Sequence, residues 1–315
     1  MIMKDTEIKI RKCGTMEVYN RQVENFPEFR LAQASIENDI LNLLERKTIL
    51  QITEPVNIQV VVHIVYSNEN ENISDSQILS QIEVLNQDYS AKNADLTKVP
   101  AVWSELVADS LVTFELANLD PDGAPSNGIT RTQTSNTAFG TDDSVKFDEQ
   151  GGKSAWATDR YLNIWVCTIG GGILGYAQFP GGPPETDGVV IDYQCFGTEG
   201  TAVAPFNLGR TATHEVGHYF NLSHTFGEGR GNSCSDSDYV DDTPNQLAPN
   251  YQKPVFPKVS CNNGPHGDMF MNYMDYVDDD TMFMFTTGQK ERMQATLLGP
   301  RASMIAGQLN ENNNV

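Results

Sequence analysis

Three of the five histidines in this 315-residue chain lie in the run HEVGHYFNLSH, at positions 214–224. On a helix, His214 and His218 share one face, so both imidazoles can bind a single zinc ion. His224 comes ten residues after His214, which corresponds to about 15 Å along a straight helix. We therefore expect the helix to end between His218 and His224, so that all three histidines are zinc ligands.

Two other residues of this run have predicted roles. Glu215 follows the first ligand, where its carboxylate can act as a general base on a water at the metal. Asn221 stands where the chain must turn, and Asn is the residue after Gly that most readily adopts a positive φ. The alternatives are surface histidines without metal and a purely structural zinc site. Three neutral histidines with an adjacent glutamate leave a fourth zinc position to water, which favours a catalytic site.

A mixed α/β scaffold is predicted around this run. Runs rich in β-branched and aromatic residues predict strands at 57–67, 112–118, 161–168 and 188–193. The Gly-rich stretch 170–184 predicts a turn that leads into an exposed edge strand. His63 lies within the first strand and is expected to be a core histidine rather than a metal ligand.

The same pattern analysis predicts the helices. Ser74 and Gln77 match a capping box at the start of a helix with one apolar stripe. A second helix, over about 207–220, carries the first two histidines. A last helix is capped near Thr286 and stopped by Gly299. A further helical pattern lies in the charged segment that precedes Pro55, in FRLAQASIENDILNLLERK.

The composition limits the classes of function. The formal net charge is −21 and the sequence pI is about 4.5. Nucleic-acid backbones and anionic membrane surfaces would therefore be repelled, so neither is an expected partner. No stretch approaches the roughly 18 to 20 apolar residues that span a bilayer. The start, MIMKDTEIKIRKCG, has no apolar core of a signal peptide, so a signal has been removed or export uses another route.

Several stretches together are similar to one protein family. HEVGHYFNLSHTF resembles its zinc helix, DYVDDTPN the loop that follows, and MNYMDYVDD its methionine turn. With YLNIWVC, LGYAQFPGG, DGVVI and FTTGQKERM, the likeness covers about residues 55–300. The chain thus resembles the pappalysin family of metzincin metalloproteases.

The resemblance implies an α/β (α+β) fold of the metzincin-like zincin type. An upper lobe, about 55–224, would hold a five-stranded mixed twisted sheet and two long helices. An irregular lower lobe, about 225–315, would end in a C-terminal helix. Together these lobes would form a catalytic domain, 55–315, and residues 1–54 would form a pro-segment.

The resemblance also implies site residues beyond the zinc helix. Met274 would lie beneath the zinc, and Tyr276 would stabilise the oxyanion of the tetrahedral intermediate. Asp279 would line the pocket that favours Arg or Lys after the scissile bond. Core packing of Met and Tyr, and a solvated acidic loop at 278–280, are the alternatives.

Calcium is the second implied ion. The resemblance assigns it to carboxylate, carbonyl and hydroxyl oxygens of Asp238, Val240, Asp242 and Thr243, with a charged surface loop as the alternative. A second calcium site is considered around Glu185 and Asp187.

The cysteines raise the question of disulfides. Cys234 and Cys261 resemble a family disulfide. Cys167 and Cys195 lie at the ends of two predicted neighbouring strands, so they could pair if the geometry allows.

The remaining cysteine, Cys13, lies in RKCGTMEVYNR, which resembles the start of the family's pro-segment. There a thiolate binds the zinc in place of water, and the nearby Arg11 and Lys12 would favour the deprotonated thiol. The alternative is an ordinary free thiol in a tail. Cleavage in or near ERKTILQ would release the zymogen, and the bonds before Arg46 and Lys47 would suit self-processing.

The sequence therefore predicts a secreted, zinc-dependent endopeptidase that acts as a monomer on peptides or proteins. A catalytically silent metal-binding or adhesive module with the same fold is the competing class, and a metal-dependent amidase or deformylase is a third. The presence of His214, Glu215, His218, His224 and Tyr276 in one chain discriminates against both.

Overall fold

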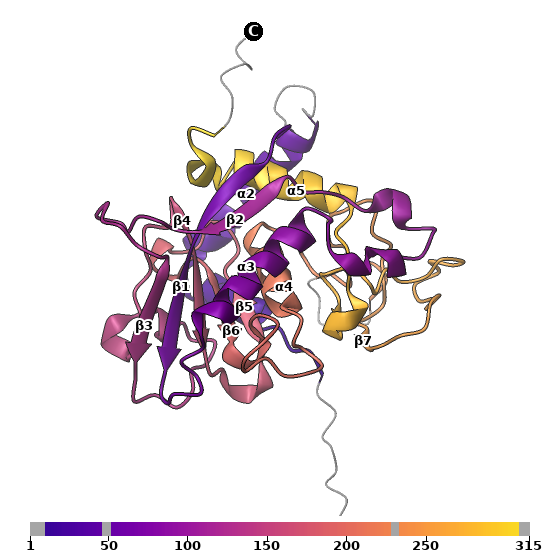
Figure 1. Ribbon diagram of the computed structural model, residues 1–315. Helices are drawn as coiled ribbons and strands as arrows, with labels where there is room; N and C mark the ends of the chain where they lie inside the picture. The colour runs from indigo at the N-terminus through magenta and orange to yellow at the C-terminus, as the bar shows by residue number, and fades with distance from the viewer. Residues whose placement is uncertain (1–9, 46–51, 228–232, 309–315) are drawn as a thin grey trace, which may run out of the picture.

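The computed structural model describes residues 10–45, 52–227 and 233–308, and its centre is a mixed β-sheet (Figure 1). The strands of this sheet are β1 (Val56–Tyr66), β2 (Val112–Leu116), β3 (Ile129–Gln133), β4 (Tyr161–Cys167), β5 (Gly175–Ala177) and β6 (Val189–Asp192). Their order is β2-β1-β4-β6-β5, and β3 also pairs with β1. β5 runs antiparallel to β6 at the edge, while the other pairs are parallel. The predicted α/β (α+β) class is confirmed. The predicted edge strand is present, but it is buried and not exposed, because the N-terminal segment lies along it.

The sheet has six strands where five were predicted, because β1 is long enough to pair with two strands on one side. Its first half, Val56–Val60, pairs with β2, and its second half, Val62–Tyr66, pairs with β3. β2 and β3 thus share one position, and the sheet is five positions wide. β1 and β4 are almost entirely buried, as expected for central parallel strands rich in β-branched residues.

Two helices, α3 (Asp75–Tyr89) and α4 (Arg210–Tyr219), pack on each other and on the sheet (Figure 1). The Ser74 side chain caps α3 by accepting from Gln77 N, as the sequence predicted. α4 begins three residues later than predicted, because Gly209 has a φ of 75° and stays outside the helix. The main hydrophobic core lies between these helices and the sheet.

The part of the chain after α4 is mostly irregular. It contains the two-residue strands β7 (Tyr251–Gln252) and β8 (Tyr276–Val277) and the helix α5 (Thr287–Leu298). α5 starts with a complete capping box, in which Thr286 and Gln289 satisfy each other's backbone N–H groups. Short 3-10 helices connect the larger elements: η1 (Ala94–Lys98), η2 (Ser104–Leu106), η3 (Ser144–Lys146), η4 (Asp148–Gln150), η5 (Gly170–Gly172), η6 (Pro184–Thr186), η7 (Tyr193–Cys195), η8 (Asp279–Thr281) and η9 (Ala302–Ile305).

The N-terminal segment is folded against the rest of the chain. It forms α1 (Thr15–Asn25), which packs on β5, and α2 (Pro27–Glu45), which packs on α5 (Figure 1). Its side chains Val18 and Ile40 are fully buried. The helical pattern predicted before Pro55 is present as α2, and the alternative in which Cys13 lies in a tail is excluded. No helix among the described residues is both long and apolar enough to cross a bilayer.

One of the two considered disulfides is present. Cys234 and Cys261 form a disulfide. Cys167 and Cys195 do not, so that prediction was wrong. Cys167 packs with Trp165 in one hydrophobic cluster, whereas Cys195 belongs to the main core with the side chain of Phe196. The two thiols lie in separate clusters: Cys167 ends β4, whereas Cys195 lies in η7, after the end of β6.

Candidate metal centre

The end of α4 brings the three histidines together. α4 ends at Tyr219, and Asn221 follows with a φ of 68°. Asn221 N donates to the His218 carbonyl at 2.9 Å, and Leu222 N donates to the Gly217 carbonyl at 3.0 Å. The predicted end of the helix and the predicted positive φ at Asn221 are both confirmed.

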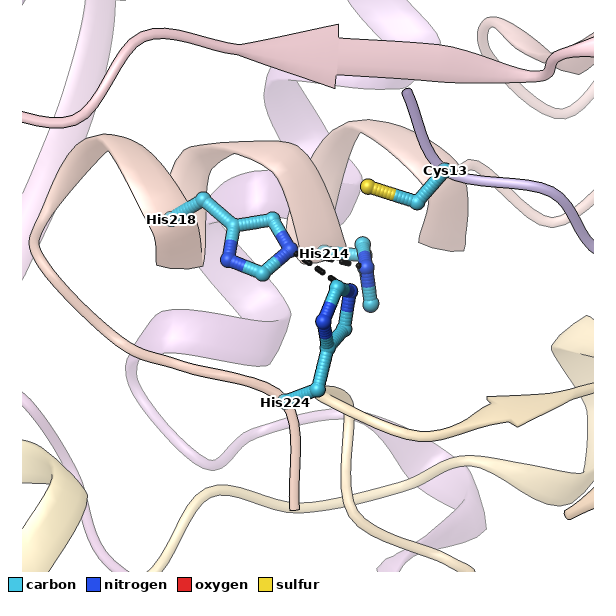
Figure 2. Close-up of side chains that lie close together, drawn as sticks. All are labelled: Cys13, His214, His218 and His224. Carbon is cyan, nitrogen blue, oxygen red and sulfur yellow. Dashed lines mark hydrogen bonds between the residues drawn. The ribbon is translucent and has the colours of Figure 1, made fainter. Parts of the chain in front are cut away.

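The three imidazoles point toward one another (Figure 2). His218 Nε2 lies 3.1 Å from His214 Nε2 and 3.0 Å from His224 Nε2. His214 Nδ1 lies 2.7 Å from the Tyr273 carbonyl, and His218 Nδ1 lies 2.7 Å from the Leu222 carbonyl. Because a carbonyl oxygen can only accept, each of these Nδ1 atoms donates its proton, and each Nε2 keeps a lone pair.

These residues fit a zinc ion. The lone pairs on His214 and His218 Nε2 face each other with no proton between them, so a cation is needed to make their approach favourable. Burial lowers the pKa of His214 and His224 well below the usual value and that of His218 to about 4. All three are therefore neutral at neutral pH, which is the form that binds zinc. Cys13 Sγ and the three ring nitrogens lie within 4.8 Å of one another, a donor set suited to tetrahedral zinc.

Glu215 lies beside the histidines and faces the N-terminal segment. Its Oε2 accepts a hydrogen bond from the Thr15 hydroxyl at 2.8 Å and lies 3.4 Å from Cys13 Sγ. Burial raises the pKa of Glu215 to about 7, although the hydrogen bonds from Thr15 and Cys13 lower it. A carboxylate with this pKa can exchange protons at neutral pH.

Met274 and Tyr276 lie below and beside the three histidines. Met274 is fully buried, and a Cβ on Gly217 would lie 2.5 Å from Met274 Sδ. Gly217 therefore lets the methionine approach α4 between the first two histidines. The Tyr276 ring centroid is 5.0 Å from that of His224 and 5.8 Å from that of His214.

Asp279 is buried and holds an arginine of the N-terminal segment. Its Oδ1 accepts from Arg11 Nη2 at 2.6 Å. Arg11 also donates to the Val277 carbonyl and to the Thr211 hydroxyl, each at 3.1 Å. The guanidinium lies over the Phe206 ring, 5.1 Å from its centroid. All these contacts match the planar, multiply donating head of an arginine.

The N-terminal segment adds to the edge of the sheet at β5. Leu174 N donates to the Lys12 carbonyl, and Gly14 N donates to the Gly175 carbonyl, each at 2.9 Å. Cys13 forms a parallel bridge with Gly175, which aims its sulfur at the three histidines (Figure 2). The surrounding cleft measures about 650 Å³.

Both basic neighbours of Cys13 have other partners in this structure. Burial, and then the nearby Glu215, raise the pKa of the Cys13 thiol well above its usual value. Arg11 turns away to Asp279, and Lys12 is exposed and donates to the Gly171 carbonyl at 3.4 Å.

Three of the four residues considered for calcium converge. The Thr243 hydroxyl oxygen lies 2.8 and 2.6 Å from the Asp238 carboxylate oxygens and 2.8 Å from the Val240 carbonyl. A single hydroxyl proton cannot serve three acceptors at once, so the Thr243 hydroxyl donates to one of these oxygens at a time. Burial raises the pKa of Asp238 to about 7, although the hydrogen bonds from Thr243 and Val240 N lower it.

Two other carboxylates considered for calcium have protein partners. Asp242 accepts from the Thr286 hydroxyl at 2.6 Å and from Gly288 N at 2.8 Å, at the start of α5. Asp187 forms two hydrogen bonds with the buried Arg301, at 2.7 and 2.9 Å. Both carboxylates therefore stabilise the chain directly.

These features define a metalloprotease of the metzincin type. They are an antiparallel edge strand, a helix with HEVGH, a chain reversal to a third histidine and a methionine packed against that helix. The chain belongs to the pappalysin family. Its residues 146–298 match the peptidase M43 family, described as pregnancy-associated plasma protein-A. A Pyricularia oryzae protein named extracellular metalloprotease is 31% identical over 309 residues, which cover 95% of this chain and 91% of that relative.

Solved structures agree with this assignment. A variant of Tannerella forsythia promirolysin is 44% identical, with a TM-score of 0.86 over 94% of this chain and 97% of that chain. Mature mirolysin from the same organism, in complex with a cleaved peptide, is 50% identical, with a TM-score of 0.79. This match covers 81% of this chain and 97% of the mature mirolysin chain.

Sequence reasoning missed the contacts that three residues make in this centre. Thr15 contacts Glu215, Arg11 pairs with Asp279, and Gly217 makes room for Met274. The only signal for Arg11 and Thr15 was the run RKCGT, in which they lie two residues before and two residues after the cysteine.

Proposed function

We propose that this metalloprotease is a secreted, zinc-dependent endopeptidase that cleaves before arginine or lysine and is made as a zymogen. The observation that carries the proposal is the buried Glu215 beside three converging imidazoles whose lone pairs face one another. A peptide substrate is supported by the cleaved peptide bound to mature mirolysin. Secretion is supported by the name of the extracellular relative.

The residues of the chain have distinct tasks in this reaction. Zinc bound by the three histidines would polarise the scissile carbonyl and acidify the attacking water. Glu215 Oε2 accepts the proton of that water and delivers it to the leaving amine. Tyr276 donates its hydroxyl proton in a hydrogen bond to the developing oxyanion. Burial raises the pKa of Tyr276 well above its usual value, so the hydroxyl keeps this proton.

Preference for a basic residue is assigned to Asp279. Its Oδ2 accepts from Leu208 N at 2.8 Å, just before α4, which leaves Oδ1 for a cation. Arg11 meets Oδ1 and also contacts Thr211 in the same pocket. We interpret Arg11 as occupying the position of the substrate side chain that follows the scissile bond.

Latency is assigned to Cys13, which takes the fourth zinc position, and to Thr15, which engages the general base. We place a boundary between a pro-segment, 1–54, and a catalytic domain, 55–315. It is supported by the two matches to mirolysin, because promirolysin covers 94% of this chain whereas mature mirolysin covers only 81%. The proposed activating cleavage at Arg46 or Lys47 falls outside the described residues.

Calcium binding is assigned to Asp238, the Val240 carbonyl and Thr243, and their crowded oxygens support it. Asp242, the fourth residue considered, accepts hydrogen bonds from Thr286 and Gly288 at the start of α5 and keeps a lone pair on each oxygen. The enzyme is proposed to act as a monomer.

The proposal is tested with two peptides that differ only by Arg or Leu at one position. We expect the Cys13→Ala chain, once its N-terminal segment has been cut off and has dissociated, to cleave the Arg peptide on the N-terminal side of Arg and to spare the Leu peptide. Glu215→Ala in the same background should lower the rate by roughly a thousandfold, as expected for loss of a general base, and a zinc chelator should abolish it. The parent chain should show a lag.

Three results would reject parts of the proposal. Cleavage that survives both the chelator and Glu215→Ala would reject the zinc mechanism. Equal cleavage of the two peptides would reject the role of Asp279, and a parent that is fully active from the start would reject latency through Cys13. Zinc binding without any cleavage, in either chain, would favour the catalytically silent module instead.

A further inference from the structure

The N-terminal segment contacts the rest of the chain far beyond the metal centre. Gln22 Nε2 donates to Gln178 Oε1 at 2.6 Å, and both side chains are buried. Gln33 Nε2 donates to the Pro180 carbonyl. The Tyr19 ring packs edge-on against Phe179, with centroids 5.8 Å apart. α1 and α2 thus have their own binding contacts, independent of Cys13.

The strongest of these contacts joins α2 to α5. Glu37 Oε1 and Oε2 accept from Arg292 Nη1 and Nη2 at 2.9 and 2.6 Å. Arg292 is only 2% exposed, whereas the Glu37 side chain is 29% exposed, so this two-point ion pair is shielded from water on the arginine side. Arg292 Nε donates to the Asn221 carbonyl at 2.8 Å. The helix α2 therefore supplies the counter-charge of an arginine that supports the turn between two proposed zinc ligands.

Apolar contacts surround this ion pair. A Cβ on Gly181 would lie only 2.6 Å from Ile36 Cδ1, so the glycine lets α2 approach the loop 179–181 closely. At the far end of α2, Leu43 packs against Gly299, which follows α5. Ile40, between them, is fully buried. This face of α5 and the loop 179–181 is therefore shaped to receive α2.

We propose that this face is a docking surface for residues 10–45, and that the N-terminal segment stays bound after the chain is cut between residues 45 and 52. The cut alone then leaves the enzyme inhibited by its own excised segment. Activity requires the segment to dissociate. The inhibition by the excised segment rests on the proposed peptidase function, whereas the binding of the segment to this face does not.

Two linked contacts explain why a cut segment would persist. The segment binds at two separate places, along β5 and, through α2, on α5. When one contact is released, the other holds the segment nearby, so the released part stays at high effective concentration and rebinds. Loss of a shielded charge pair acts mainly on the dissociation rate. The Glu37–Arg292 pair therefore governs how long the excised segment stays.

The test uses the full chain with residues 46–51 replaced by the recognition sequence of a specific external protease. After complete cutting, we expect the N-terminal fragment to co-elute with the catalytic part in gel filtration, with or without a metal chelator. Peptidase activity should appear slowly after dilution. Glu37→Gln should raise the dissociation rate by about tenfold or more, because it leaves the buried Arg292 without this carboxylate partner.

The matched control is Asp39→Asn, which removes the same charge from an exposed position on the same helix. It should leave the dissociation rate unchanged, and thermal midpoints of the uncut chains verify that both variants fold. Immediate separation of the fragment on cutting would overturn the inference. Equal dissociation rates for the two variants would overturn the role of Glu37. Co-elution followed by release without any activity would support the docking surface and reject the proposed peptidase function.

Discussion

His63 is a neutral histidine in the core of the sheet. Its Nε2 lies 2.9 Å from Asn163 Oδ1, an oxygen that also accepts from Trp156 N at 2.7 Å. Nε2 therefore donates, and Nδ1 accepts from the Thr130 hydroxyl at 2.7 Å. Burial lowers the pKa of His63 to about 4. The expectation of a core histidine is confirmed, and the residue has no free nitrogen for a metal.

This histidine makes stability depend on pH. Between pH 6.5, the usual pKa, and about pH 4, the unfolded chain binds a proton that folded His63 does not. Stability is therefore lost as the pH falls, by up to about 1.4 kcal/mol per pH unit, and the contribution is constant above this window. His63→Gln should reduce the pH dependence by this amount. Urea unfolding of parent and variant at pH 5 and pH 7, in chelator, measures it, and identical pH dependence in both would contradict the prediction.

At the scale of elements, the helix α4 forms the site because it ends at Tyr219, which lets the chain turn so that His224 faces His214 and His218. The left-handed Asn221 turns the chain, and its carbonyl is held by Arg292 from α5. Its Nδ2 has no hydrogen-bond partner within the described chain. The asparagine is therefore present for its backbone conformation and not for a side-chain contact.

Substitutions at this position separate conformation from chemistry. Asn221→Gly should keep or slightly raise stability, because Gly adopts positive φ without strain. Asn221→Val should lose about 2 kcal/mol, because a left-handed conformation is most strained for β-branched residues, and should bind zinc more weakly. Urea unfolding and zinc competition with a chromophoric chelator measure both effects. A valine variant that binds zinc as the parent does would show that the turn does not position His224.

At the scale of the whole molecule, the metal centre joins distant parts of the chain. α4 provides His214 and His218, the lower segment provides the Tyr273 carbonyl that orients His214, and the N-terminal segment provides Cys13. A ligand that binds only the folded chain stabilises it by mass action. Zinc is therefore expected to tie the N-terminal segment to the catalytic part.

Metal removal tests this coupling. Chelation should lower the thermal midpoint of the full chain, and the drop should be smaller for Cys13→Ala, which has one ligand fewer. Zinc should also transfer to a chelator on the order of tenfold faster or more from Cys13→Ala, as expected when support of a metal site is lost. The metal-free chains should have similar midpoints, which serves as the control. Equal transfer rates would show that Cys13 does not bind the zinc.

The sequence alone determined the features that depend on neighbours along the chain. The spacing of His214 and His218, the turn at Asn221 and the caps at Ser74 and Thr286 are all decided within a few residues by helix geometry and backbone sterics. The long buried strands were predicted for the same reason, because their β-branched pattern is local.

The tertiary structure decided what depends on packing between distant segments. The pairing of Arg11 with Asp279, and of Glu37 with Arg292, joins residues more than 250 positions apart, which no local pattern encodes. The direction of Cys167 depends on the face of the sheet to which it belongs, and this face follows from how the strands assemble. A short-range pattern specifies the geometry of an element, whereas its partners are chosen by the burial and charge of the complete chain.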